Sequence, residues 1–283
     1  MFQISNSGDA LGWSGERAPP HHPRAPGGSL TPAPPVEHMC LAYDDAAEFR
    51  THAADFLTAG VAAGEHVWFV GPAGPAPIDA PGRIIDTAQA YGADLLDPAA
   101  QVAAYAAATD AALAAGYTGL RVAADVSTLL PTPAHRDAFA RYEFAIGRYM
   151  LTAPFRAVCG YDRATLGDAV IAELACLHPR ATAGSAPFHL YPASPRPGHV
   201  HLTGELDVTT EQLLTTALRR TEPGRPLVLH GEQLDFIDHR SLLVLDRHAE
   251  QHRTTLVLRT RSSAVRRLAE LIEPAHIRVE VVA

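Results

Sequence analysis

The chain has 283 residues, of which 47% are hydrophobic and 19% charged, a composition typical of a soluble protein with room for two domains. No apolar run reaches the roughly 18–20 residues that a membrane span needs, and the N-terminus lacks the basic start and apolar stretch of a secretory signal. The formal net charge of −8 argues against a nucleic-acid partner, because phosphate binding needs a concentrated basic surface. We therefore expect a cytoplasmic protein that binds neither membranes nor nucleic acid.

Two residue types narrow the chemistry further. All 23 basic residues are arginine, so the lysine of a P-loop and the lysine of Schiff-base or pyridoxal chemistry are both missing. The three cysteines, Cys40, Cys159 and Cys176, are too few and too scattered for a disulfide framework, and we expect reduced thiols. No cofactor is predicted.

Residues 1–35 are rich in Pro, Gly, Ser and Ala and predict a disordered tail, because such a segment buries too little apolar surface to fold. After it, apolar runs alternate with helical patterns. Strands are expected at 38–43, 66–70, 83–86, 119–126 and 156–161, and helices at 45–63, 98–115, 133–150 and 167–177. Helices between successive strands indicate crossover connections, hence an α/β domain with a mostly parallel sheet and helices on both faces.

A second break in composition falls at residues 179–198, where Pro, Gly, Ser and Ala again dominate. We interpret 183–198 as a linker that includes a first short strand, FHLY. Strands at 199–203, 227–230, 255–258 and 278–282 then alternate with helices at 210–220, 239–251 and 262–271, with GELD expected to form a turn. Residues 187–283 thus predict a small α/β domain of about 95 residues.

Two motifs in this second domain resemble the STAS family (sulfate-transporter/anti-sigma-antagonist). GELD ends at Asp207, and LDFID ends at Asp238, where an apolar helix begins at once. The resemblance implies a partner of the anti-sigma factor or kinase type. It also implies a serine directly after the second motif, where the N-terminus of a helix can hold a phosphate.

The expected acceptor is replaced here. His239 stands where the resemblance places the serine, Ser241 where it places a glycine, and His230 where it places an acidic residue. The simplest interpretation is a docking surface without its phospho-switch. Ser241 as a shifted acceptor and a His230/His239 pair acting as a pH or metal switch remain alternatives. Asp207 and Asp238 are expected to cap helices, a role compatible with contacting a partner.

Residues 36–182 resemble the MEDS family, the methanogen/methylotroph, DcmR sensory domain. The resemblance rests on the order and spacing of short motifs: H-x-C-x-x-Y at 38–43, FLTAGVAAGEHVWFV at 56–70, YTGLRVAADVS at 117–127, YE at 142–143, CGYDR at 159–163 and HP at 178–179. It implies a sheet similar to that of RecA and KaiC without the nucleotide machinery, and a role in sensing small hydrocarbon-derived signals. The absence of lysine agrees with the missing nucleotide site.

A ligand in an open parallel sheet is expected beyond the carboxyl ends of the strands. The predicted pocket is lined by Tyr43, Tyr142, Glu143 and Tyr161, with His38 and Asp162 as further candidates. A metal site is a weaker alternative, because its four candidate ligands include no close CxxC or HxxxH pair. Those ligands are His38, Cys40, Cys159 and His178.

Catalytic signatures are weak. Asp125, Ser127 and His135 contain the residue types of a hydrolase triad, but no G-x-S-x-G motif surrounds Ser127. Glu143 and Asp162 are conceivable as an acid–base pair. We therefore expect a non-enzymatic signalling protein involved in transcription regulation, with a small-molecule-transforming enzyme or a constitutive scaffold with a vestigial sensor as alternatives.

Overall fold

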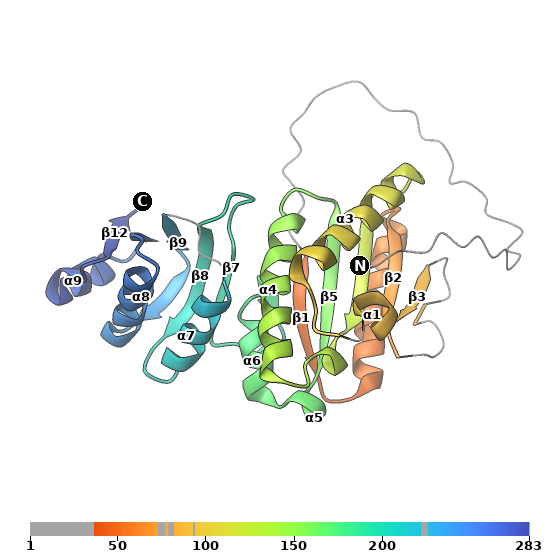
Figure 1. Ribbon diagram of the computed structural model, residues 1–283, viewed down its shortest axis with the longest axis horizontal. Helices are drawn as coiled ribbons and strands as arrows, with labels where there is room; N and C mark the ends of the chain where they lie inside the picture. The colour runs from red at the N-terminus through yellow and green to blue at the C-terminus, as the bar shows by residue number, and fades with distance from the viewer. Residues whose placement is uncertain (1–36, 73–76, 79–81, 93, 222–225, 283) are drawn as a thin grey trace, which may run out of the picture. The chain divides into compact units, whose positions relative to one another are not determined.

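The computed structural model describes residues 37–72, 77–78, 82–92, 94–221 and 226–282, which belong to one compact unit, Pro35–Ala283. The tail expected at residues 1–35 lies outside the described residues. Two sheets organise the described chain, one in each half (Figure 1). Among the described residues, no helix combines the length and apolarity needed to cross a membrane.

The first sheet has six strands in the order β3-β2-β4-β5-β1-β6, and every neighbouring pair is parallel. The predicted parallel α/β architecture is therefore confirmed for this half. Its elements are β1 (His38–Tyr43), α1 (Ala46–Ala62), β2 (His66–Gly71), β3 (Arg83–Asp86), α2 (Thr87–Tyr91), α3 (Pro98–Ala114), β4 (Leu120–Asp125), η1 (Ser127–Leu129), α4 (Pro133–Met150), β5 (Phe155–Asp162), α5 (Arg163–Leu166), α6 (Asp168–Ala175) and β6 (Arg180–Ala181).

Helices cover both faces of this sheet, as expected. Helix α1 packs against the face that carries Leu41, Phe69 and Val158. Helices α3, α4 and α6 lie on the opposite face, which carries Cys40, Ala42, Val122 and Cys159. Successive residues of β1 alternate between the two faces because side chains of a strand point to opposite sides in turn.

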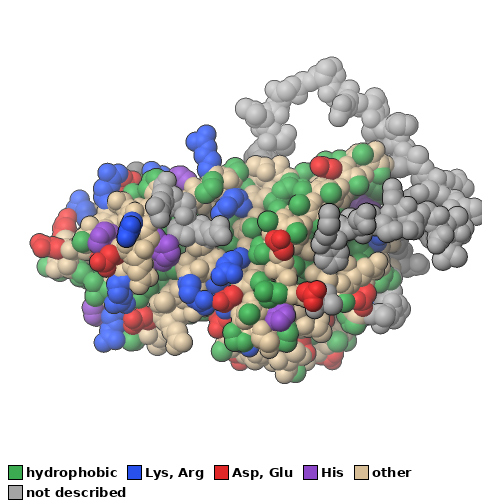
Figure 2. All heavy atoms as spheres, viewed as in Figure 1, with side chains coloured by type: hydrophobic (Ala, Val, Ile, Leu, Met, Phe, Trp, Pro, Cys, Tyr) green, Lys and Arg blue, Asp and Glu red, His purple; other side chains and the backbone are tan. Residues whose placement is uncertain are grey.

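Aspartates start several of these helices. Asp45, Asp86, Asp97 and Asp162 each accept a hydrogen bond from a backbone N–H in the first turn of the helix that follows. Each carboxylate satisfies a donor that the helix leaves unpaired, which fixes where α1, α2, α3 and α5 begin. The alanine-rich helix α3 has a partly exposed apolar side, and Figure 2 shows hydrophobic side chains gathered along it.

The second sheet has the order β10-β8-β9-β11-β12, with β7 pairing antiparallel to β8 and the other pairs parallel. Its elements are β7 (Phe188–Pro192), β8 (His199–Leu206), α7 (Glu211–Arg220), β9 (Leu227–Gly231), β10 (Leu234–Ile237), α8 (His239–Gln251), β11 (Leu256–Thr260), α9 (Ser263–Ile272) and β12 (Ile277–Val281). The sheet is mixed rather than fully parallel because of β7.

The prediction that GELD forms a turn is wrong, because Gly204–Leu206 continue strand β8 and pair with β10. Gly204 has a φ of 86°, and a Cβ there would lie 2.6 Å from the carbonyl oxygen of Pro187. The glycine therefore permits both the unusual backbone conformation and the close approach of β7.

Candidate functional site

Four buried side chains with metal-ligating chemistry lie together beneath α4. His38 comes from β1, Glu143 from α4, Cys159 from β5, and His178 follows α6. One ligand atom of each lies within 4.8 Å of those of the other three. The exposed fractions of these residues are 1%, 0%, 4% and 0% in the same order. We call these four residues the buried cluster.

Glu143 is the centre of the buried cluster. Its Oε2 lies 2.9 Å from Nε2 of His38 and 3.4 Å from Nε2 of His178. Its Oε1 accepts a hydrogen bond of 3.0 Å from the hydroxyl of Tyr161. Sγ of Cys159 lies 4.0 Å from Nε2 of His38. One carboxylate thus connects two strands, one helix and the segment after α6.

The electrostatics of the buried cluster favour an ionised carboxylate. Burial alone would raise the pKa of Glu143, but the charge interaction with His178 and the hydrogen bond with His38 outweigh it and lower that pKa. Burial and the nearby Glu143 raise the pKa of the Cys159 thiol well above its usual value. Without a bound cation, the thiol is therefore protonated at neutral pH.

The hydrogen bonding of His178 fixes its tautomer. Nδ1–H of His178 donates to the backbone carbonyl of Leu174 at 2.9 Å, so that Nε2 carries a lone pair in the neutral ring. This Nε2 has no hydrogen-bond partner among the described residues, and neither has Nδ1 of His38. Both buried nitrogen atoms are therefore without a hydrogen bond, which costs free energy, and Nε2 of His178 is the one that lies 3.4 Å from Oε2 of Glu143, where a bound cation would satisfy it.

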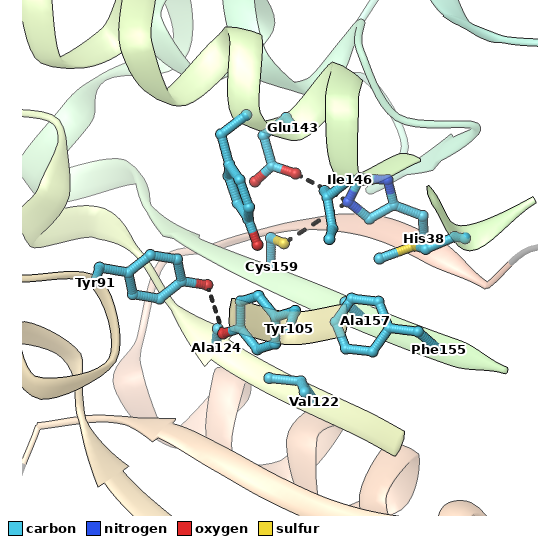
Figure 3. A pocket seen from close by; sticks show the side chains of 12 residues that line it. His38, Tyr91, Tyr105, Val122, Ala124, Glu143, Ile146, Phe155, Ala157 and Cys159 are labelled. Atoms are coloured by element: carbon cyan, nitrogen blue, oxygen red, sulfur yellow. Dashed lines mark hydrogen bonds and ion pairs between the residues drawn. The ribbon is translucent and has the colours of Figure 1, made fainter. Parts of the chain in front are cut away.

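A small internal cavity of about 10 Å³ adjoins the buried cluster, which is about the room that one water molecule needs. Figure 3 shows His38, Glu143 and Cys159 along this cavity, together with Tyr91 and Tyr105, whose hydroxyls are 3.1 Å apart. The other lining side chains are mostly apolar. The wall of the cavity is thus aromatic and aliphatic on one side and is formed by the buried cluster on another side.

A larger pocket of about 270 Å³ lies at the carboxyl ends of β3 and β4. It is lined by α2, η1, the start of α4 and the segment before α3, with Leu96, Leu129 and Phe139 among its apolar side chains. His135 and Asp94 supply polar groups. Among the described residues, Tyr91 alone lines both this pocket and the small cavity, so its ring stands between them.

The structure places the predicted pocket residues on two sides of the sheet. Tyr142 and Glu143 line the small cavity together with His38, and Tyr161 reaches it through Glu143. Tyr43 lies on the α1 side, where its hydroxyl donates to Asp125 at 2.9 Å. Asp162 caps α5. Tyr43 was misplaced because alternation along β1 puts it opposite His38.

The polar groups considered for catalysis are occupied in local structure. Ser127 donates to Asp125 at 2.8 Å and accepts from the backbone N–H of Asp162 at 2.9 Å. The ring of His135 instead lies 2.7 Å from the hydroxyl of Thr132, the N-cap of α4. Ser127 and Asp125 thus form a hydrogen bond, whereas the ring of His135 contacts Thr132.

Sequence reasoning missed part of this site. Cys40 is fully buried but is not one of the four clustered groups. Glu143 occupies the position that the predicted metal site assigned to Cys40. Tyr91 and Tyr105 were also missed. Tyr105 belongs to the buried stripe of α3 formed with Gln101, Thr109 and Ala112, a spacing that the sequence displays. Tyr91 lies on α2, which is too short to predict.

In the second half, strand pairing brings two predicted partner residues together. Leu206 pairs with Ile237, so Asp207 and Asp238 follow at the same edge of the sheet. Oδ1 of Asp238 accepts from the backbone N–H of Ser241 and caps α8, whereas Oδ1 of Asp207 accepts from the backbone N–H of Thr209 in the turn before α7. The expected cap is thus found at Asp238, and Asp207 stabilises a turn.

His239 begins α8 and is exposed, whereas Ser241 is fully buried and its hydroxyl has no partner among the described residues. His230 lies beside His199, with 3.2 Å between Nε2 and Nδ1, and its ring is 5.6 Å from that of His201. The histidine partners of His230 recorded in the structure are therefore on β8.

The buried cluster is connected directly to the second sheet. Nδ1–H of His189 on β7 donates to the carbonyl of His178 at 2.9 Å, and the backbone N–H of Leu190 donates to the carbonyl of Cys176 at 2.6 Å. Arg220 on α7 donates to Asp137 on α4 at 2.8 Å and to Glu173 on α6 at 2.9 Å. Elements of the two halves thus share hydrogen bonds and ion pairs.

Comparison with known proteins gives one family. The model of the MEDS family, the methanogen/methylotroph, DcmR sensory domain, matches residues 37–179, which is about half of the chain. The match ends before β7 and gives no support to the resemblance of residues 187–283 to STAS domains. Searches of curated proteins and of solved structures found no match. The buried cluster and both cavities lie on residues inside the matched range, and the chain belongs to the MEDS family of sensory domains.

Proposed function

We propose that this protein is a non-enzymatic regulator whose MEDS domain binds a small molecule and whose C-terminal half docks a protein partner of the anti-sigma factor or kinase type. The observation that carries the proposal is the hydrogen bonding of β7 to the segment 176–178, which contains a residue of the buried cluster. A change at the ligand site therefore has a short covalent and hydrogen-bonded route to the second sheet.

The 270 Å³ pocket is the proposed binding site of the small molecule. Its position at the carboxyl ends of parallel strands is where open α/β sheets commonly bind ligands, and its lining combines apolar side chains with Asp94, Thr128 and His135, which suits a compact compound that carries a polar group. Tyr91 then contacts the ligand on one side and the small cavity on the other. Movement of this ring is the proposed first response to binding.

The proposed docking surface of the second half is the edge at which Asp207 and Asp238 meet. Exposed apolar side chains accompany them: Val208 is 55% exposed, Phe236 52% and Leu243 37%. Exposed apolar groups with a polar rim are typical of protein interfaces. Two features support a STAS-like domain: the mixed arrangement of strands in this sheet, and the position of Asp238 at the N-terminus of α8.

The burial of Ser241 supports docking without a serine phospho-switch. A kinase needs access to the hydroxyl, and Ser241 is 0% exposed. His239 occupies the exposed first position of α8 and has no hydroxyl to phosphorylate. Regulation is therefore proposed to arrive from the MEDS domain.

The test of ligand binding uses the full chain and a panel of one- to three-carbon alcohols, aldehydes and chloroalkanes, with the melting temperature as the readout. We expect at least one compound to raise it, because a ligand that binds only the folded state stabilises that state. Leu129→Trp fills the pocket and should abolish the shift, whereas Leu95→Trp, at a side chain 54% exposed and outside the pocket lining, should keep it. An unchanged melting temperature with every compound, or an equal shift in both variants, would contradict the proposed site.

A further inference from the structure

We propose that the buried cluster binds one divalent transition-metal ion of the zinc class through Nε2 of His38, Oε2 of Glu143, Sγ of Cys159 and Nε2 of His178. This inference goes beyond the proposed function and does not depend on the small molecule or the protein partner. Imidazole, carboxylate and thiolate are the three donor types that proteins use for zinc.

The separations of these atoms suit tetrahedral coordination. Bonds of about 2.0–2.3 Å place neighbouring ligand atoms of a tetrahedral zinc roughly 3.3–3.6 Å apart. The structure has 2.9 Å between His38 and Glu143, 3.4 Å between His178 and Glu143, and 4.0 Å between Cys159 and His38. The other pairs of ligand atoms lie within 4.8 Å of each other, so inward movements of up to about an ångström would complete the coordination shell.

The orientation of His178 points to a cation at this position. Its Nδ1–H is committed to the carbonyl of Leu174, so the lone pair on Nε2 lies 3.4 Å from a carboxylate oxygen of Glu143. A lone pair and a carboxylate repel each other unless a proton or a metal ion lies between them. A metal-ligating histidine commonly donates its second nitrogen to a backbone carbonyl in this way.

Charge balance favours the metal over a shared proton. A divalent ion with one carboxylate, one thiolate and two neutral imidazoles is formally neutral, which suits a site whose residues are at most 4% exposed. As the sulfur–metal bond forms, the Cys159 thiol releases its proton to solvent, and a proton shared between Glu143 and an imidazole leaves as well. A shared proton would bind Glu143 and one imidazole nitrogen, and would engage neither the Cys159 thiol nor the other imidazole nitrogen.

The small cavity would lie next to the bound metal ion. Three of the four ligands, His38, Glu143 and Cys159, line it, and it has about the room that one water molecule needs. An ion held by the buried cluster would therefore face this cavity, which Tyr91 also lines. A water or a small oxygen donor in that space would lie next to the metal.

The test uses untagged full-length protein produced in medium supplemented with Co²⁺, because a buried site is filled as the chain folds. Metal content by mass spectrometry and the visible absorption of cobalt are the readouts. We expect about one cobalt per chain, with the intense bands of tetrahedral cobalt and a sulfur-to-cobalt charge-transfer band. A wild-type protein that folds and retains no stoichiometric metal would overturn the proposal.

Matched variants identify the ligands. Cys159→Ser should lose the charge-transfer band, whereas Cys40→Ser should keep it, although Cys40 pairs directly with Cys159 across β1 and β5 and is equally buried. Glu143→Gln should retain roughly a tenth of the metal or less. His230→Ala should retain all of it, which controls for the histidines on β8 and β9.

Two outcomes would contradict this assignment. Equal metal content in Cys159→Ser, Glu143→Gln and the wild type would place the ion elsewhere, for example on histidines of the N-terminal residues. Loss of the charge-transfer band in Cys40→Ser but not in Cys159→Ser would overturn the donor set. If Glu143→Gln does not fold, as judged by circular dichroism, Cys159→Ser, Cys40→Ser and the wild-type spectrum still test which residues bind the metal.

Discussion

Tyr161 and Glu143 illustrate how much a single buried hydrogen bond contributes in this fold. Both side chains are fully buried, and the Tyr161 hydroxyl donates to an ionised carboxylate at 3.0 Å. We predict that Tyr161→Phe lowers the free energy of unfolding by about 1.5–3 kcal/mol, because the carboxylate loses a donor that water cannot replace. Urea unfolding measures this. The control is Tyr191→Phe, at a half-buried side chain, which should change stability by less than about 0.5 kcal/mol.

Ser241 is a second buried polar group, but one without a partner. Because its hydroxyl has no hydrogen bond among the described residues, Ser241→Ala should leave stability unchanged or raise it by up to about 1 kcal/mol. Thermal unfolding of the variant tests the stability. Mass spectrometry after incubation with kinases tests accessibility, and phosphate on Ser241 of the folded protein would show that the fold does not shield it.

His248 is expected to make the protein sensitive to acid. Burial, with repulsion from the neighbouring His252, lowers the pKa of His248 to about 4, whereas an unfolded chain has a value near 6.5. Between these two pH values the unfolded state binds more protons, so stability falls as the pH falls through this window. The contribution is on the order of 2 kcal/mol after allowance for partial hydration of the ring.

The measurement compares wild-type protein with His248→Leu by denaturant unfolding at pH 7 and at pH 4.5. The difference in stability between the two proteins should shift in favour of the variant at the lower pH. A difference that does not change with pH would show that His248 titrates alike in the folded and unfolded states.

At the scale of elements, Arg219 and Arg220 at the end of α7 contact the first half in different ways. Arg220 is 4% exposed and donates to Asp137 and Glu173, whereas the side chain of Arg219 is 58% exposed and donates to Asp137 alone. Burial alone would raise the pKa of Asp137, but the two arginines outweigh it and lower that pKa.

We predict that Arg220→Ala lowers the free energy of unfolding by about 2–4 kcal/mol, because two carboxylates lose a buried partner. Arg219→Ala should cost less than about 1 kcal/mol, since solvent screens an exposed ion pair. Calorimetry would show the difference. Equal effects of the two substitutions would mean that burial does not set the strength of these contacts.

The sequence predicts elements well where the pattern is long and regular. The helices expected at 45–63, 98–115 and 133–150 correspond to α1, α3 and α4, which begin at the capping residues Asp45, Asp97 and Thr132. Helices α2 and α5 have five and four residues, too few for a periodic signal. Strand β8 was predicted too short because Gly204 resembles a turn residue until the approach of β7 is known.

The site was predicted in part for a related reason. Spacing along a strand shows that His38 and Cys40 share a face, and that Cys159 and Tyr161 do too. It does not show that α4 places Glu143 beside these strand residues, or that the chain after α6 brings His178 next to them. The residue types were recognisable, whereas their grouping depends on how helices cross the sheet.

In the molecule as a whole, three features of the described chain link the pocket to the second sheet. A pocket at the carboxyl ends of the strands shares Tyr91 with the small cavity, the cavity adjoins the buried cluster, and the backbone at His178 receives a hydrogen bond from His189 on β7. We propose that ligand binding in the MEDS domain stabilises β7 of the second sheet.

Hydrogen–deuterium exchange of the full chain tests this claim most directly, with the compound that gives the largest rise in melting temperature as the probe. We predict slower exchange both at the pocket and at residues 174–178 and 188–192, with the second effect lost in His189→Leu. Slower exchange confined to the residues that line the pocket, with β7 unchanged, would contradict this coupling between the pocket and the second sheet.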